Sequence, residues 1–145
     1  MPVEAAVASH YACRDLVSAI EAGLEALGKS KDSVSIEDLA PVDEFHIGGR
    51  EATSELGARL DLSDDTDLLD LGCGIGGAAR FYATEFGCKV TGVDLTAEYV
   101  ATARTLTEWA GPFEAVRFHM GSVVDLPFED ASFDCATQIH LGMNI

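Results

Sequence analysis

The chain has 145 residues, with 25 acidic and 9 basic side chains, a formal charge of -16 and an isoelectric point near 4.3. This length suits one domain with a hydrophobic core, but it is short for a complete doubly wound enzyme. The negative charge opposes binding to nucleic acids and to anionic membrane surfaces, so we expect neither as a partner.

The cysteines and the N-terminal sequence indicate the compartment. Cys13, Cys73, Cys88 and Cys135 are widely separated and form no C-x-x-C pair, which argues against a metal site and against a disulfide framework. Residues 1–9 lack the basic start and the apolar core of a signal peptide. No apolar run approaches the ~20 residues that cross a bilayer. We therefore expect a soluble, cytoplasmic protein.

Residues 1–62 are predicted to form a helical segment that acts as a lid on the following domain. Apolar residues recur every three or four positions in three stretches, which is typical of helices with one buried face. These stretches are 5–27, 36–40 and 51–60. Gly28 is expected to end the first helix, Ser35 with Asp38 to start the second, and Pro41 to end the second.

The loop between the second and third of these helices has an unusual composition. Its sequence, Pro41–Arg50, contains a histidine, two adjacent glycines and an arginine. We interpret it as the second wall of a ligand site, in which Phe45 or His46 faces the substrate and the glycines allow a hinge. A plain helix-entry turn explains the glycines equally well, and a single histidine is more often structural.

The chain is organised around residues 67–77, whose sequence is DLLDLGCGIGG. The first half is a short apolar run with acids, which predicts a strand of a parallel sheet, and the second half is a glycine loop that leads into helix-forming residues. Glycine permits the backbone turn, and it lets a ligand lie against bare backbone and the first amides of the helix. The pattern predicts a nucleotide-cofactor site.

Two classes of cofactor fit this loop. Gly72, Gly74 and Gly77 satisfy the G-x-G-x-x-G dinucleotide pattern, and Asp94 ends the next predicted strand, where an acid can bind ribose hydroxyls, so a nicotinamide enzyme is one interpretation. Asp70, however, places a carboxylate beside the loop. It would repel a pyrophosphate and attract the sulfonium and ammonium groups of S-adenosylmethionine. The structural alternative for Asp70 is a carboxylate that accepts hydrogen bonds from loop amides.

Helices and strands alternate after the glycine loop without hairpin signals. This predicts an α/β fold with a Rossmann-like, doubly wound parallel sheet of about four strands over residues 63–145. Further strands are expected at 88–93, 115–119 and 132–139, and helices at 78–86 and 96–109. Ligands of such sheets bind beyond the carboxyl ends of the strands. We therefore expect Asp70, Asp94, residues 121–123 and residues 138–140 to converge on one crevice.

Three successive segments resemble the motifs of class I S-adenosylmethionine-dependent methyltransferases. They are residues 68–77 (LLDLGCGIGG), residues 90–95 (VTGVDL), and the pair LPF and SFD within residues 126–134. Two more, residues 43–50 (DEFHIGGR) and 140–145 (HLGMNI), are similar to those of small-molecule members, such as the sarcosine/dimethylglycine and ubiquinone/menaquinone methyltransferases. The resemblance covers about residues 67–145.

The resemblance implies that the cofactor is S-adenosyl-L-methionine, and it implies which residues hold it. Asp70 and the glycines would hold the methionine part, Asp94 the ribose, and the Ser122 loop the adenine. Many relatives have aspartate where Ser122 stands, so direct contact with the adenine amino group is expected to be weaker, water-mediated or absent. The expected cofactor-binding residues are Asp70, Gly72, Cys73, Gly74, Gly76, Asp94, Leu95, Ser122, Val123 and Gln138.

The implied reaction is an in-line displacement, in which a nitrogen, oxygen or carbon atom of a small molecule attacks the sulfonium methyl group. It requires proximity, alignment and exclusion of water more than it requires a catalytic base. If the attacking atom carries a proton, His140 or His46 is expected to remove it, since imidazole titrates near pH ~6.5. His140 is the better placed of the two because it follows the fourth strand.

Relatives continue beyond the fourth strand with at least three more strands, so this strand is expected to be an apolar sheet edge. A truncated methyltransferase, a split or frameshifted product, and a homodimer that pairs through this edge are all compatible with that expectation. A cofactor-binding or assembly fragment without turnover is the alternative to an enzyme.

Overall fold

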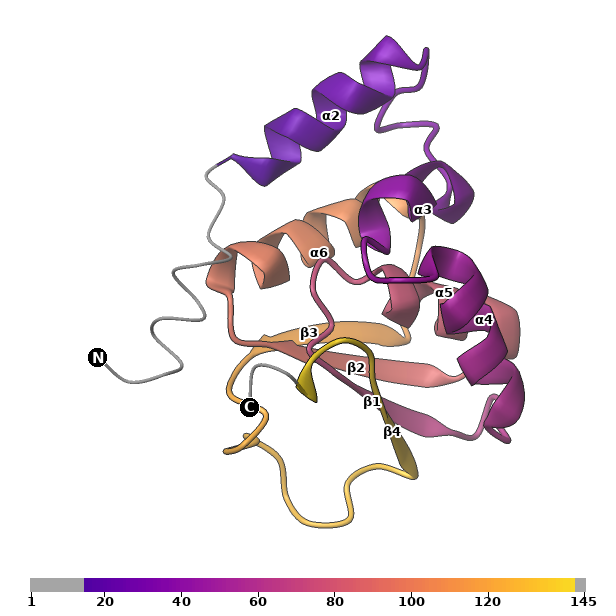
Figure 1. Cartoon of the computed structure of the whole chain (residues 1–145), viewed down its shortest axis with the longest axis vertical. Coiled ribbons are helices and arrows are strands. Elements are labelled where there is room, and N and C mark those ends of the chain that lie inside the picture. The colour runs from indigo at the N-terminus through magenta and orange to yellow at the C-terminus, as the bar shows by residue number, and fades with distance from the viewer. Residues whose placement is uncertain (1–14, 143–145) are drawn as a thin grey trace.

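Four parallel strands form one sheet, and the helices pack around it (Figure 1). The computed structural model describes residues 15–142. Its elements are α2 (Leu16–Ala26), α3 (Ile36–Asp43), α4 (Gly49–Arg59), β1 (Asp67–Leu71), α5 (Gly77–Phe86), β2 (Lys89–Asp94), α6 (Ala97–Ala110), β3 (Val116–Met120) and β4 (Cys135–Gln138). The strand order is β3-β2-β1-β4. The prediction of a Rossmann-like α/β fold with about four parallel strands is therefore confirmed.

The main core lies between the sheet and two helices. Leu68 of β1, Val90 of β2 and Phe118 of β3 are buried together with Tyr82 of α5 and Ala103 of α6. Two more aromatic residues of α5, Phe81 and Phe86, also pack against this cluster. Gly87 ends α5 in the left-handed conformation, as its sequence position indicates.

In a second core cluster, α2 packs against α6. Ile20 and Leu24 of α2 are buried with Leu39 of α3, Ile75 of the glycine loop and Leu106 of α6. Figure 1 shows α2 lying above α6, which in turn lies above the sheet. The N-terminal helices therefore pack against the glycine loop and α6. The division of the chain at residue 62 stays a prediction.

The end of α3 differs from the sequence-based prediction. Pro41 lies inside α3, which continues to Asp43, because Asp43 is held by a buried ion pair that outweighs the backbone bond lost at proline. Of the helix predicted at 5–27, the part from Leu16 is seen and residues 5–14 lie outside the described range. It ends as expected, with Leu27 as the C-cap and Gly28 in the left-handed conformation.

Strand β4 is shorter than the predicted 132–139. Asp134 precedes it and pairs with Asp67, donating its N–H to the Asp67 carbonyl oxygen at 2.9 Å and accepting the Asp67 N–H at 2.8 Å. His140 follows it with φ 53°, which breaks the extended backbone. Within residues 15–142, no helix is both long enough and apolar enough to cross a membrane.

Candidate functional site

The carboxyl ends of the four strands meet at one edge of the sheet, because all the strands are parallel. The glycine loop after β1 bonds directly to β2: Gly72 donates its N–H to the Val93 carbonyl oxygen at 2.8 Å. The loop after β3 bonds to the same strand, with Gly121 N–H donating to the Asp94 carbonyl oxygen at 3.0 Å. These bonds hold the loops after β1 and β3 against β2, and the convergence of the predicted site residues on one crevice stays a prediction.

The glycines of the loop serve two different purposes. Gly72, Gly74 and Gly76 all have positive φ, at 72°, 54° and 87°. A Cβ atom at Gly76 would lie 2.5 Å from the Phe118 ring, and one at Gly72 would lie 2.9 Å from Leu141, so these two glycines permit close packing. A Cβ atom at Gly74 would meet nothing within 4 Å. The backbone is therefore open to a ligand over Gly74.

A buried arginine donates a hydrogen bond to the backbone of the glycine loop. Arg80 of α5 is fully buried and donates from Nη2 to the Ile75 carbonyl oxygen at 2.9 Å and to Asp43 Oδ1 of α3 at 2.6 Å. Its Nη1 donates to Thr107 Oγ1 at 2.8 Å on α6. Burial raises the pKa of Asp43, and the Arg80 guanidinium opposes that rise. One side chain thus joins the loop to α3, α5 and α6.

Asp94 ties the glycine loop to the start of α6. Its Oδ2 accepts the Gly74 N–H at 2.9 Å, and its Oδ1 accepts the Thr96 N–H at 2.9 Å. Thr96 occupies the N-cap of α6 as predicted, but its side chain makes no capping bond. The loop-anchoring role that we weighed for Asp70 therefore belongs to Asp94.

Asp70 is a buried carboxylate with one unused oxygen. Its residue is 3% exposed, and its Oδ1 accepts the Thr137 hydroxyl of β4 at 3.1 Å, while its Oδ2 has no hydrogen-bond partner. Burial raises its pKa to about 6; the Thr137 bond opposes this rise, and the charges of Asp94 and Glu44 add to it. A buried carboxylate oxygen without a partner is costly, and a cationic ligand would remove that cost.

The loop after α3 brings a third acid to the site. Glu44 is buried and accepts the Arg50 Nε–H at 2.8 Å and the Thr53 hydroxyl at 3.2 Å, both from α4. The Arg50 guanidinium lies 4.7 Å from the centroid of the Phe81 ring. The wall predicted from the sequence of residues 41–50 is thus fixed to α4 and α5, and it carries negative charge toward Asp70.

Two histidines from opposite ends of the chain lie next to each other. His46 follows Glu44, and His140 follows β4; their ring centroids are 5.8 Å apart. His46 Nε2 lies 3.3 Å from Thr53 Oγ1, and its Nδ1 lies 3.2 Å from the Ile47 carbonyl oxygen. The two residues predicted as proton acceptors therefore lie close together, and their role stays a prediction.

Comparison with known proteins assigns the family. A family model described as a methyltransferase domain matches residues 68–145, which is more than half of the chain and includes β1, the glycine loop and β4. This chain belongs to that methyltransferase family. The matched region contains Asp70, Asp94 and His140, whereas Glu44 and His46 precede it.

Individual relatives agree with this assignment. The glycine/sarcosine/dimethylglycine N-methyltransferase of Actinopolyspora halophila is 33% identical over 94 residues, which are 65% of this chain and 17% of that protein. The 2-methyl-6-phytyl-1,4-hydroquinone methyltransferase of Synechocystis is 34% identical over 91 residues, 63% of this chain and 28% of that protein. The chain spans well under half the length of each of these relatives.

Solved structures show the same fold. An S-adenosylmethionine-dependent methyltransferase from Thiobacillus denitrificans, solved with S-adenosyl-L-homocysteine, has a TM-score of 0.54 and 30% identity, and the match covers 61% of this chain and 36% of that one. A geranyl diphosphate C-methyltransferase from Streptomyces coelicolor A3(2) has a TM-score of 0.53 and 26% identity, covering 60% and 33%.

The predicted site residues of this methyltransferase domain differ in what they present to the crevice. The Cys73 side chain is buried against Gly92, and burial raises the pKa of its thiol, so only its backbone belongs to the loop. Leu95 is half-buried, and the Ser122 hydroxyl accepts the Val124 N–H at 3.3 Å within its own turn. Val123 is half-buried beside it, and Gln138 is exposed at the end of β4.

Sequence reasoning missed several residues of the methyltransferase domain site. Thr137 lies opposite Asp70 in the β1–β4 register, and this contact follows only once the strand order is known. Glu44 lies within the segment DEFHIGGR, whose composition did draw attention to that loop. Asp43 begins the same segment, whereas Arg80 carries no local signal, because it sits in a helix where a charge is usually exposed. Within residues 15–142 there is no group of three or more His, Cys, Asp or Glu side chains placed to hold a metal ion.

Proposed function

We propose that this chain is the cofactor-binding part of an S-adenosylmethionine-dependent methyltransferase that methylates a small molecule in the cytoplasm. The observation that carries the proposal is the unpartnered Oδ2 of Asp70, buried beside the glycine loop. An ammonium group of the cofactor would supply the missing hydrogen-bond donor and a compensating charge. Solved relatives bound to S-adenosyl-L-homocysteine support the same cofactor class.

The residues present fit this cofactor better than a dinucleotide. Asp70, Asp94 and Glu44 place three carboxylates around the crevice, and the charges of Asp94 and Glu44 raise the pKa of Asp70. A pyrophosphate would be repelled by this charge, whereas a ligand with a sulfonium and an ammonium group is attracted. The open side of Gly74 provides the bare backbone against which such a ligand rests.

We assign the remaining contacts from the order of the strands. Asp94 uses one lone pair of each oxygen for the loop, which leaves lone pairs for ribose hydroxyls. Leu95 follows it, so we place Leu95 with Ser122 and Val123 at the adenine. Gln138, at the end of β4, is assigned to the methionine end of the site. The glycines Gly72, Gly74 and Gly76 shape the loop.

The bound cofactor supplies an electrophilic methyl group, and the protein positions the reactants and excludes water from them. Arg80 and Asp94 fix the loop that orients the ligand, and Asp70 holds its charged end. When the acceptor atom carries a proton, His140 or His46 accepts it on an imidazole nitrogen. Their adjacency, with ring centroids 5.8 Å apart, supports assigning the role to either ring.

Ligand binding and turnover distinguish two other functions from the proposed one. A cofactor-binding or assembly fragment would bind the ligand without turnover, and a nicotinamide oxidoreductase would prefer NADH. A homodimer through the outer edge of β4, which pairs only with β1 among the described strands, stays a prediction that light scattering can test.

Calorimetry with S-adenosyl-L-homocysteine and with NADH tests the proposal. We expect the first ligand to bind and the second to fail to compete with it. Asp70→Asn should weaken the affinity at least tenfold, because it removes the charge that faces the ammonium group. The matched control is Asp67→Asn, which changes an acid that is 46% exposed at the other end of the same strand.

Preferential binding of NADH, or equal affinity of both variants and the wild type, would contradict the assignment. Formation of S-adenosyl-L-homocysteine from a metabolite mixture then separates an enzyme from a binding fragment.

A further inference from the structure

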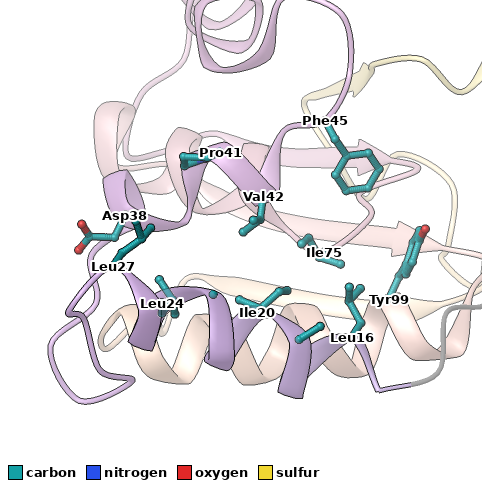
Figure 2. Close-up of a pocket in the computed structure, with 12 residues that line it drawn as sticks. Leu16, Ile20, Leu24, Leu27, Asp38, Pro41, Val42, Phe45, Ile75 and Tyr99 are labelled. Atoms are coloured by element: carbon teal, nitrogen blue, oxygen red, sulfur yellow. The ribbon is translucent and has the colours of Figure 1, made fainter.

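A large apolar groove lies between the N-terminal helices and the methyltransferase domain. Its volume is about 470 Å³, within the range of small-molecule sites. In Figure 2, Ile20 and Leu24 of α2 face Val42 of α3 across the groove. Phe45 and Tyr99 stand at one end, while Leu27 and Asp38 stand at the other.

The groove offers almost nothing to a charged ligand. Asp38 is the only charged residue in its lining, and its carboxylate is already engaged by the Ser35 N–H at 3.0 Å and by Lys29 Nζ at 3.2 Å. Large apolar side chains continue outward from the groove: Phe45 is 66% exposed, and Ile47 beyond it is 83% exposed. Adjacent exposed apolar side chains of this kind are typical of a surface that receives an apolar ligand.

One end of the groove adjoins the proposed cofactor site. Ile75, which lines the groove, lies in the glycine loop between Gly74 and Gly76. Phe45 lies between Glu44 and His46, the residues that form the second wall of the crevice. A molecule seated in the groove therefore contacts the glycine loop at Ile75 and the adjoining loop at Phe45.

We propose that this groove binds the uncharged hydrocarbon body of the methyl acceptor, with the reacting end directed toward Ile75 of the glycine loop. The inference rests on the proposed methyltransferase function and adds the chemical class of the substrate, a neutral lipophile. The lining offers no cationic side chain to an anionic body, and the volume holds a molecule of drug-like size.

Gly23 provides a substitution that fills the groove. It lies in α2, it lines the groove, and a Cβ atom there would meet nothing within 4 Å. Gly23→Leu therefore adds a side chain into empty space and replaces glycine by a better helix former, so the chain should fold. The matched control is Ala22→Leu, which adds the same side chain to the same helix at an exposed position outside the lining.

The probe is N-phenyl-1-naphthylamine, an uncharged aromatic molecule whose fluorescence rises in apolar surroundings. With the full chain we expect saturable binding at one site, at least tenfold weaker in Gly23→Leu and unchanged in Ala22→Leu. Linear 1-alkanols should displace the probe with an affinity that rises about fourfold per methylene group until the groove is full. Calorimetry of each variant with S-adenosyl-L-homocysteine should give affinities within twofold of the wild type.

The outcomes separate this inference from the proposed function. If the probe does not saturate, or if it binds both variants equally, the groove assignment is overturned, while binding of S-adenosyl-L-homocysteine would still support the function. If the probe binds but S-adenosyl-L-homocysteine does not, the assignment of the groove to a methyl acceptor is overturned together with the function. A dimer that the probe dissociates, measured by light scattering, would make the groove an interface between copies and also overturns the inference.

Discussion

Asp70→Asn should make the unliganded protein more stable at neutral pH, even though we expect it to weaken cofactor binding. The substitution keeps an oxygen that can accept the Thr137 hydroxyl, and it removes a charge from a site that is 3% exposed. Burial, Asp94 and Glu44 disfavour that charge, so the pKa of Asp70 rises from 3.8 to about 6. The folded state therefore binds this proton more tightly than the unfolded state does.

The size of the effect follows from that shift. A rise from 3.8 to about 6 corresponds to about 3 kcal/mol of stability, which is present in full below pH ~4 and is lost as the pH rises through about 6. Between pH 5 and pH 7 the wild type should lose about 1 kcal/mol through this group. Asparagine does not titrate, so the variant should not lose this part of the free energy of unfolding. Other buried acids, such as Asp43, still titrate in both proteins and contribute equally to both.

Urea unfolding of both proteins at half-unit steps from pH 5 to pH 8 measures the difference. The gap between the free energies of unfolding should widen in favour of Asp70→Asn up to about pH 7 and stay constant above it. Asp67→Asn, at a largely exposed acid of the same strand, should show no such widening. A constant gap across the whole pH range would mean that Asp70 is ionised in the folded state at pH 5, and it would refute the account of a strained, unpaired carboxylate.

Three further substitutions test other parts of the structure. Asp43→Ala leaves the Arg80 guanidinium buried without its carboxylate partner, so we expect a loss of about 3 to 5 kcal/mol in chemical unfolding. Gly74→Ala forces a side chain to φ 54° and should cost about 1 kcal/mol, while its methyl group blocks the open side of the loop and abolishes S-adenosyl-L-homocysteine binding in calorimetry. Ser35→Ala removes the capping box of α3 and should lower the free energy of unfolding by about 1 kcal/mol, with no change in ligand affinity.

The sheet and its loops could be predicted because their signals are local. The apolar run before Gly72, the acid at the end of the second strand and the glycine that ends α5 each specify a short piece of backbone. Parallel pairing then brings the carboxyl ends of the strands together whatever the details of packing. The capping box at Ser35 was predicted for the same reason, since both partners lie within four residues.

The contacts that decide the chemistry are not local. Asp70 and Thr137 are 67 residues apart, and Arg80 and Asp43 are 37 residues apart, so neither pair leaves a pattern in the sequence. Asp94 and not Asp70 accepts hydrogen bonds from the loop amides. This difference depends on where each side chain lies in the folded protein. The apolar groove also escaped prediction, because its lining comes from α2, α3, the glycine loop and α6 together.

The Arg80 contacts limit how the crevice can open. Swinging α3 away from α5 would leave a guanidinium buried without its carboxylate, so α3 should stay in place while ligands enter and leave. We then expect movement to be confined to the short connection from Phe45 to Gly48, because Gly48 and Gly49 have positive φ and would permit a hinge. Exchange of the bound molecule would in that case leave the rest of the fold undisturbed.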